Sequence, residues 1–411
     1  MEFGLILMYC VAIFGLFSSF FFLLVILESR NNLSNPKLKK FKKVTVVVPA
    51  YNEEKTIKKT LDSLLKLDWP KSKIQIIVVD DGSTDSTSSI VTEYMKKGIA
   101  LIIQENKGKG SAMNTGLKNA EGEFFACLDA DSVVERDALK TMIGFFEDDS
   151  VMAVTPTLKL KNPTTWLDKI QNVEYIIGIY LRKTFSIINA LNVTPGPFTI
   201  YRKWFFDKYG GYDEKNLTED MEIAMRIQKH HYKIENSLGA YVYTKPASTF
   251  SALMKQRIRW YKGALDNFIN YRSLFSKDYG DFGVILLPSC IISVALVEIL
   301  CAYLVVKNII EYTKNAINWY YIGFDFQNLF TFNFNWFMFT FRPLIILTAV
   351  GFFLGIAIIL ISKKISNEKE HIKISYILYL VFYLFLFGLW WAIAIYYKIT
   401  GKKIKWGKNE L

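Results

Sequence analysis

Cysteine is scarce in this sequence, with only four among 411 residues. Cys10, Cys290 and Cys301 stand in apolar segments, and Cys127 stands in a short apolar run. Cys290 and Cys301 are eleven positions apart, about 16 Å along a helix, which is too far for a disulfide. No spacing matches a zinc site. We therefore expect neither disulfides nor zinc, and we interpret the four cysteines as small apolar core residues.

The sequence also lacks a nucleic-acid-binding motif, although its formal net charge is +12. Its lysines and arginines cluster beside the apolar ends of the chain, a pattern typical of the cytoplasmic flanks of membrane helices. Hydrophobic residues make up 51% of the chain and aromatic residues 16%, which is high for a soluble protein. We therefore expect membrane lipid and no nucleic acid as a partner. The sequence leaves the oligomeric state open.

The N-terminus lacks the basic start, short apolar run and small-residue cleavage site of a secretory signal. Residues 3–27 are instead uncharged and long enough to span a bilayer. Residues 1–30 are therefore predicted to form a transmembrane anchor. Arg30 and five lysines within 37–43 follow it. By the positive-inside rule, the N-terminus is outside and the next domain is cytoplasmic, in a multi-pass protein of the cell membrane.

Three further apolar segments predict membrane spans in a C-terminal region covering residues 276–411. Four spans in total place the C-terminus outside, where its many lysines contradict the positive-inside rule. The spans are 283–306, 343–361 and 374–397, and the lysines are Lys398, Lys402, Lys403, Lys405 and Lys408.

Two features of this region remain open to interpretation. The aromatic-rich segment 319–341 is either an interfacial helix or a re-entrant segment. Glu298 stands inside an apolar segment, where a charge is costly unless it faces protein or water. It is a candidate for a polymer channel or a helix contact, or else it lies at a helix end.

Between residues 44 and 128, short β-branched or apolar runs alternate with amphipathic stretches. This βαβαβαβ pattern predicts an α/β fold with a mostly parallel sheet and helices on both faces. Each predicted strand ends in polar residues, so we expect these loops to gather at one edge of the sheet, where such folds bind ligands. The predicted strands are 44–49, 74–79, 100–103 and 124–128, and the predicted helices are 55–66, 86–97 and 111–120.

Asp129 and Asp131 directly follow the last of these strands. Alternate residues of an extended chain point to one side, so both carboxylates can face one ion. So few hard oxygen ligands suit Mg²⁺ or Mn²⁺ completed by water and phosphate. For an isolated pair, an ordinary turn after a strand is the alternative.

Four motifs follow the predicted strands: Pro49-Ala50-Tyr51-Asn52-Glu53, Asp80-Asp81-Gly82-Ser83-Thr84-Asp85, Lys107-Gly108-Lys109-Gly110 and Asp129-Ala130-Asp131. In this order they resemble the motifs of family 2 glycosyltransferases with the GT-A fold. The resemblance covers roughly residues 41–135 and implies a nucleotide-sugar donor, usually a uridine diphosphate sugar. The implied donor-binding residues are Ala50, Tyr51 and Glu53 at the base and ribose, with Asp81, Lys107 and Asp129 also facing the nucleotide. Asp131, together with Asp129, is implied to hold the metal that bridges the diphosphate.

The next segments bring the resemblance toward the acceptor. Apolar residues at three- and four-residue steps in 166–188 predict a helix, either in the core or lying against the membrane. Gly196 stands in a small-residue turn that, in the resembling processive enzymes, lies near the acceptor sugar; an ordinary turn is the alternative. Glu219 and Asp220 match the pair that holds the family's catalytic base. Acidic residues in a first helical turn can also simply favour the helix dipole.

Residues 251–275 predict a further interfacial helix that carries Gln256-Arg257-Ile258-Arg259-Trp260. On a helix, Gln256, Arg259 and Trp260 share one face, and Arg257 is expected to point elsewhere. Arg259 offers a fork matched to phosphate, and Trp260 offers a flat platform for a sugar. The motif resembles one found in cellulose, chitin and hyaluronan synthases and in ceramide glucosyltransferases, which implies donor and acceptor contacts for it.

We therefore expect a cytoplasmic GT-A domain over 41–250, held by membrane helices. The expected activity is inverting, metal-dependent transfer from a uridine diphosphate sugar to a growing β-linked glycan, as in processive polysaccharide synthases, including the poly-N-acetylglucosamine type. A transferase that adds one sugar to a membrane lipid is the alternative, and a non-catalytic sugar or nucleotide sensor is a third. All the acidic residues that the family uses are present, which argues against the sensor.

Overall fold

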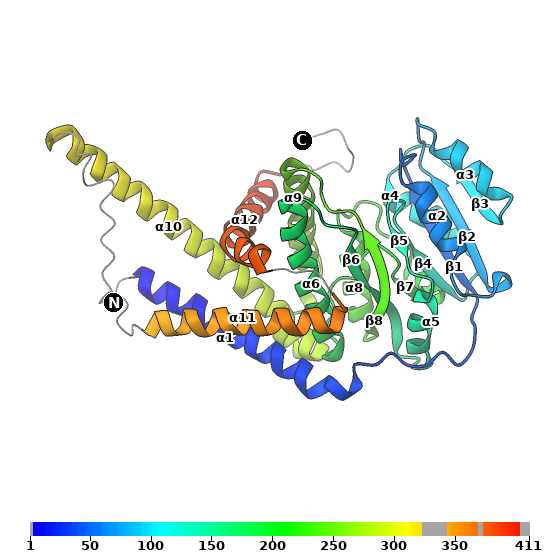
Figure 1. Cartoon of the computed structure of the whole chain (residues 1–411), viewed down its shortest axis with the longest axis horizontal. Helices are drawn as coiled ribbons and strands as arrows, with labels where there is room; N and C mark the ends of the chain where they lie inside the picture. Colours follow the sequence, from blue (N-terminus) through cyan, green and yellow to red (C-terminus); the bar gives the residue numbers. More distant parts are fainter. Residues whose placement is uncertain (1–2, 323–342, 369–372, 403–411) are drawn as a thin grey trace.

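The computed structural model describes residues 3–322, 343–368 and 373–402. An α/β domain built on an eight-stranded sheet lies at one end of the molecule, and long helices extend from it toward the other end (Figure 1). The strands are β1 (Val44–Ala50), β2 (Ile74–Asp80), β3 (Ile99–Ile103), β4 (Phe124–Cys127), β5 (Val133–Val134), β6 (Val151–Leu160), β7 (Ile200–Arg202) and β8 (Lys233–Thr244).

The strand order is β3-β2-β1-β4-β7-β6-β8-β5. Strands β1 to β4 pair in parallel, as the alternating pattern predicts. The sheet as a whole is mixed, because β7 pairs antiparallel with both β4 and β6, and β5 pairs antiparallel with β8. β6 and β8 pair in parallel, so the expectation of a mostly parallel sheet holds; the antiparallel pairings all involve the short strands β7 and β5.

Two separate hydrophobic cores cover the two faces of the sheet. Along β1, Val46 and Val48 point into one core, while Val47 points into the other, as the two-residue period of a strand requires. Buried apolar residues of α2, α3 and α5 complete the first core, and those of α4, α7 and α8 complete the second. These helices are α2 (Ile57–Leu65), α3 (Thr87–Met95), α4 (Lys109–Lys118), α5 (Ala138–Ile143), α7 (Lys203–Tyr209) and α8 (Glu219–Lys229).

Two long helices join the α/β domain to the apolar helices. α6 (Trp166–Ile187) begins at a capping box formed by Thr165 and Asp168, and it packs on β6 and β8 as well as on α1, α11 and α12. The helix predicted over 166–188 is thus present, and Ile170 and Val173 of its apolar stripe are buried. α9 (Phe250–Asn270) carries the Gln256–Trp260 motif and packs against α8 and α12.

Four helices are long and apolar enough to cross a membrane, and they match the predicted spans. Glu298 lies well inside one of them, so the helix-end interpretation does not apply. Most of segment 319–341 lies outside the described residues. All four cysteines are free, but only Cys127 is buried; Cys290 and Cys301 are half-buried and Cys10 is exposed, so the interpretation of all four as core residues is corrected. The four helices are α1 (Phe3–Glu28), α10 (Leu287–Ile322), α11 (Pro343–Ser366) and α12 (Lys373–Ile399).

Candidate active site

The polar loops after β1, β2 and β4 meet at one edge of the sheet, as the sequence predicts. Asp81 N–H donates to the Ala50 carbonyl at 2.9 Å, and Leu128 N–H donates to the Val47 carbonyl at 2.9 Å. These bonds extend the parallel ladders past the strand ends, so the loops leave from the same level. The acidic and basic residues that follow each strand therefore gather at this edge.

The loop after β1 is locked to the loop after β2. Asn52 has a left-handed φ of 52°; its N–H donates to Ser83 Oγ at 3.0 Å, and its Oδ1 accepts from Thr84 N–H at 2.8 Å. This arrangement leaves the Tyr51 ring 40% exposed beside buried Ala50. An exposed ring on a fixed loop is suited to stacking against a nucleobase.

Asp81 organises the basic loop that follows β3. Its Oδ1 accepts from Gln104 Nε2 at 2.7 Å and from Lys107 N–H at 3.0 Å, and its Oδ2 accepts from Gly108 N–H at 2.7 Å. Both carboxylate oxygens are therefore engaged with the protein. In this arrangement Asp81 shapes the loop, and the exposed side chain of Lys107 projects from it.

Lys109 joins the two acidic motifs, and the sequence interpretation did not assign it a role. Its Nζ lies 2.8 Å from Asp129 Oδ1 and 3.2 Å from Glu219 Oε1. Burial alone lowers the pKa of Lys109, but the charges of Asp129 and Glu219 outweigh this and hold the pKa well above its usual value. Lys109 is the first residue of α4, and this position at the sheet edge is the signal that distinguishes it from Lys107.

Asp131 lies in a crowded acidic environment. Burial, together with the charges of Asp129 and Glu53, raises the pKa of Asp131 to about 6. Carboxylates placed this close favour a cation between them. Within the described residues no three Asp, Glu, His or Cys side chains form a complete metal cage. Asp131 and Asp129 therefore fit a Mg²⁺ or Mn²⁺ ion whose remaining ligands are water and phosphate.

The turn at Gly196 presses directly against this acidic group. A Cβ atom on Gly196 would lie 3.0 Å from Lys109 Nζ and 3.6 Å from Asp129 Oδ2, so a side chain there would displace the ion pair. Phe198 adopts a left-handed φ of 64°, and Thr194 Oγ1 donates to the Asp220 carbonyl at 2.7 Å. The turn thus connects Asp129 and Lys109 to Asp220.

Glu219 and Asp220 open α8 and have different surroundings. Glu219 is buried in its ion pair with Lys109, whereas Asp220 is only half-buried. Burial and the charge of Glu219 raise the pKa of Asp220 to about 6, against the lowering effect of Lys109 and Arg259. A carboxylate with this pKa is deprotonated at neutral pH yet basic enough to accept a proton.

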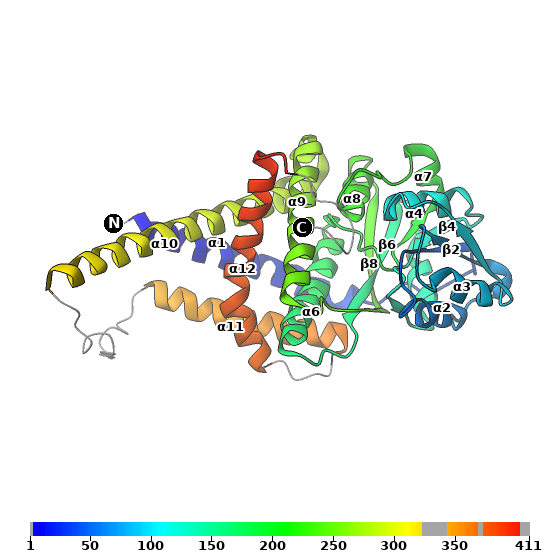
Figure 2. The ribbon, with the colours of Figure 1, turned by 90° about the horizontal axis from the view of Figure 1, so that it is seen from above.

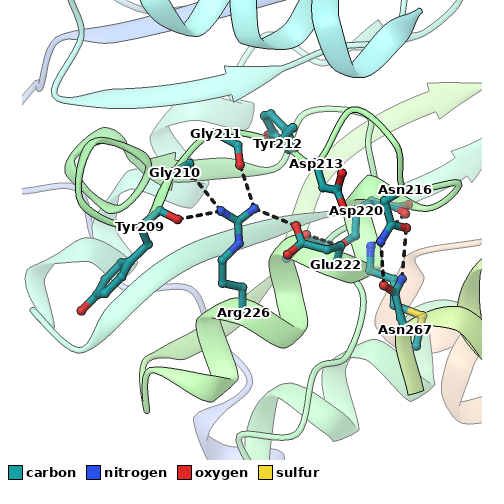
Figure 3. Close-up of polar contacts among 12 residues, drawn as sticks. Tyr209, Gly210, Gly211, Tyr212, Asp213, Asn216, Asp220, Glu222, Arg226 and Asn267 are labelled. Atoms are coloured by element: carbon teal, nitrogen blue, oxygen red, sulfur yellow. Dashed lines mark hydrogen bonds and ion pairs between the residues drawn. The ribbon is translucent and has the colours of Figure 1, made fainter. Parts of the chain in front are cut away.

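A polar network fixes the start of α8 (Figure 3). Arg226 donates to the Tyr209, Gly210 and Gly211 carbonyls at 2.8–3.1 Å and pairs with Glu222 at 2.7 Å. These contacts hold residues 209–211 onto α8, the helix that begins with Glu219 and Asp220.

α9 is fastened to the same loop from the other side. Arg259 Nη1 donates to the Leu217 carbonyl at 2.8 Å, and Asn267 Nδ2 donates to Thr218 Oγ1 at 3.0 Å. Gly263 permits this close approach, because a Cβ atom there would lie 2.4 Å from Thr218 Oγ1. The structure therefore brings Arg259 near Asp220, close enough for its charge to lower the pKa of that carboxyl.

The prediction that Arg257 points away from its motif is wrong. Its guanidinium lies 4.1 Å from the centre of the Trp260 ring and donates to Gln256 Oε1 at 2.7 Å. It is fully buried and pairs with Glu174 of α6 at 2.5 Å. Tyr383 of α12 donates to the same Glu174 oxygen. The helical period places only the start of the Arg257 side chain. Its long chain then turns along the helix, so that the guanidinium contacts Gln256 and Trp260.

Removing the Arg257 side chain is expected to destabilise the protein. Arg257→Met leaves Glu174 charged and without its cation, which costs about 3 kcal/mol for a buried pair. Thermal unfolding of the detergent-solubilised protein should therefore occur at a lower temperature. Arg257→Met combined with Glu174→Gln should recover part of the loss, and a double variant no more stable than the single one would contradict the pairing.

The fold is a Rossmann-like sheet with acidic loops at its edge. A lysine lies between these loops, and a helix facing them carries a carboxylate. Together these features define a glycosyltransferase of the GT-A fold. The family described as "Glycosyl transferase family 2" matches residues 45–210. Relatives include a poly-β-1,6-N-acetyl-D-glucosamine synthase from Staphylococcus epidermidis, 31% identical over 294 residues that cover 70% of this chain and 69% of the relative. The enzyme of that name from Staphylococcus aureus strain COL is 31% identical, over 69% of this chain and 70% of the relative. The chain therefore belongs to glycosyltransferase family 2.

A solved structure supports the fold over most of the chain. The mannosyltransferase PcManGT from Pyrobaculum calidifontis, in complex with GDP-Man and Mn²⁺, aligns with a TM-score of 0.54 and 20% sequence identity. The alignment covers 88% of this chain and 100% of that protein. At this identity the likeness concerns the fold alone.

Proposed function

We propose that the protein is a membrane-bound, inverting glycosyltransferase that uses a uridine diphosphate sugar and elongates a β-linked polysaccharide. The observation that carries this proposal is the single site in which Asp129, Asp131, Lys109 and Asp220 meet beside helices able to cross a membrane. Donor-binding loops, a metal-type carboxylate pair and a basic carboxylate occupy one place. A sensor would need no base with a pKa matched to proton transfer.

In the proposed reaction, the acceptor hydroxyl oxygen attacks the anomeric carbon of the donor sugar. The bond from that carbon to the diphosphate breaks, the uridine diphosphate leaves, and the hydroxyl proton passes to Asp220. Attack opposite to the leaving group inverts the anomeric centre, giving a β-linkage from an α-linked donor. Lys109 holds Asp129 and Glu219 in place, so Asp220 remains the carboxylate that can accept the proton.

Asp131 and Asp129 are the residues that would hold a divalent cation, with Glu53 nearby. Such an ion acts as a Lewis acid that stabilises the negative charge developing on the departing diphosphate. Tyr51 would stack on the base, Ala50, Glu53 and Lys107 would line the nucleotide side, and Asp81 would hold the Lys107 loop in place.

We further propose that the sugar is N-acetylglucosamine in β-1,6 linkage, because two relatives above 30% identity are synthases of that polymer. Purified protein should then incorporate label from UDP-N-acetylglucosamine in preference to UDP-glucose or UDP-galactose. Size analysis of the labelled product tests the proposal that the protein elongates a polysaccharide. A ladder or high-molecular-weight product is expected, whereas one discrete glycolipid at high donor concentration would indicate the lipid-acceptor alternative.

Replacing Trp260 is expected to shorten the polymer. Arg257 stacks on its ring, and we propose that Trp260 receives the terminal sugar of the acceptor. Trp260→Ala should reduce product length while donor hydrolysis continues, as measured by gel sizing and by release of uridine diphosphate. Trp204→Ala, a 38% exposed tryptophan on α7, is the matched control. Equal product length in both variants would remove Trp260 from the acceptor site.

A further inference from the structure

α12 has the length and hydropathy of a membrane span, but it packs differently from the other three candidates. In its most apolar stretch 29% of the residues are buried inside the protein, compared with 6% in α1, 17% in α10 and 6% in α11. It packs chiefly along α9 and α6 and also touches α10. Figure 2 shows α12 running alongside α9 and across the directions of α1, α10 and α11.

α9 identifies the level at which α12 lies. A helix with as many charges as α9 does not lie in the hydrocarbon of a bilayer. α12 contacts it at successive levels: Trp390 Nε1 donates to Met254 Sδ at 2.9 Å, the Tyr261 ring stacks on Trp390, and Lys398 Nζ lies 2.6 Å from Asp266 Oδ1. The C-terminal third of α12, from Trp390 to Lys398, therefore lies beside a charged helix. The charged residues of α9 are Lys255, Arg257, Arg259, Lys262 and Asp266.

Both ends of α12 are fastened to the catalytic side. Just before it, Lys159 at the end of β6 donates to the Asn367 carbonyl at 3.3 Å and lies 3.8 Å from Glu368 Oε2. At its far end, Lys398 pairs with Asp266 of α9. A helix of 27 residues is about 40 Å long, and the hydrocarbon core of a bilayer is about 30 Å thick. A crossing helix would place these ends at opposite surfaces.

The two faces of α12 differ in the way that an interfacial helix requires. The face toward the protein carries tyrosine and tryptophan, residues typical of the membrane–water interface. The opposite face is exposed and apolar, with a spacing that forms one stripe along the helix. The buried residues are Tyr376, Tyr383, Trp390, Trp391 and Ala394, and the exposed stripe is Ile374, Ile377, Val381, Phe385, Leu389, Tyr396 and Ile399.

We propose that α12 lies in the plane of the membrane on the side of the catalytic domain, with its exposed stripe in lipid. The chain then crosses the bilayer three times, through α1, α10 and α11, and ends on the catalytic side. Lipid is the partner of the stripe because α12 packs on α10, itself a candidate span, and so lies where the bilayer begins. This arrangement also removes the conflict with the positive-inside rule, since the lysines after residue 397 now share a side with those at 37–43.

Thiol labelling in intact and permeabilised cells tests the number of crossings, with wild-type protein giving the background. Three exposed positions are compared: Thr400→Cys after α12, Ser89→Cys on α3 of the catalytic domain, and Asn315→Cys near the far end of α10. With a membrane-impermeant maleimide, Thr400→Cys and Ser89→Cys should label under the same condition, and Asn315→Cys under the opposite one. Any other pattern, above all Thr400→Cys labelling with Asn315→Cys, overturns the proposal.

A depth measurement tests the orientation of α12 without reference to catalysis. Nitroxide labels at Ile377, Phe385 and Tyr396 report depth from their relative accessibility to oxygen and to a water-soluble nickel complex. In the proposed arrangement the three labels lie at one shallow depth. A label at Phe385 much deeper than the other two, which would mark the centre of a crossing helix, overturns the proposal.

Discussion

Asp220→Asn is expected to lower sugar transfer by about 10²–10⁴-fold, the usual contribution of a general base. The amide has the size and shape of the carboxylate but does not accept a proton. Asp220 Oδ1 accepts from Met221 N–H at 2.9 Å, and an amide oxygen can keep that bond. Donor binding, measured by calorimetry with the uridine nucleotide, should stay within a few-fold of wild type, because in the proposed reaction Asp220 acts on the acceptor hydroxyl.

The pH dependence provides a second readout of the same role. The pKa of Asp220 is raised to about 6, so the protonated, inactive form of the base accumulates as the pH falls through 6. Wild-type transfer should therefore decline on the acid side, and the residual activity of Asp220→Asn should lack this decline. Asp213→Asn, an exposed carboxylate in the preceding loop, is the matched control. Loss of donor binding in Asp220→Asn, or an unchanged acid limb, would assign Asp220 a structural role.

The sheet edge was predictable because its signals are local. β-Branched runs such as Val44–Val48 fix strands, polar residues mark their ends, and parallel pairing then brings Asp81 and Asp129 to one edge. The second half offered no such regularity. β7 has three residues and β5 has two, so they carry too little pattern to predict their antiparallel pairing.

The contacts that complete the site depend on tertiary structure. Lys107 and Lys109 are equivalent in sequence, and only the start of α4 directs Lys109 between Asp129 and Glu219. Arg257 pairs with Glu174, which is 83 residues away. Hydropathy detects α12 but measures only its composition, and its direction follows from packing on α9. A charged or apolar segment in a sequence thus predicts that its side chains contact other groups, while the fold determines which groups these are.

Asp131→Asn is expected to lower metal-dependent turnover by about 10²-fold or more. A Lewis-acid cation contributes several kcal/mol to the transition state, and each 1.36 kcal/mol is a factor of ten in rate. Removing one of the two carboxylates at the end of β4 should weaken Mn²⁺ binding in the presence of uridine diphosphate, as measured by electron paramagnetic resonance of free Mn²⁺. Asp149→Asn, a fully exposed carboxylate paired with Arg202, is the control.

The same substitution is expected to stabilise the metal-free protein at neutral pH. Because burial, Asp129 and Glu53 raise the pKa of Asp131 to about 6, its charged form is unfavourable in the folded state without a cation, and the neutral amide removes that penalty. If Asp131 holds a metal, the substitution should raise thermal stability and abolish turnover. If Asp131 has only a structural role, the substitution should lower both. Turnover of wild-type protein that needs a metal should stop in excess chelator, so full turnover there would rule out the metal. Asp129 and Asp131 would then lie close together without the cation that makes their proximity favourable.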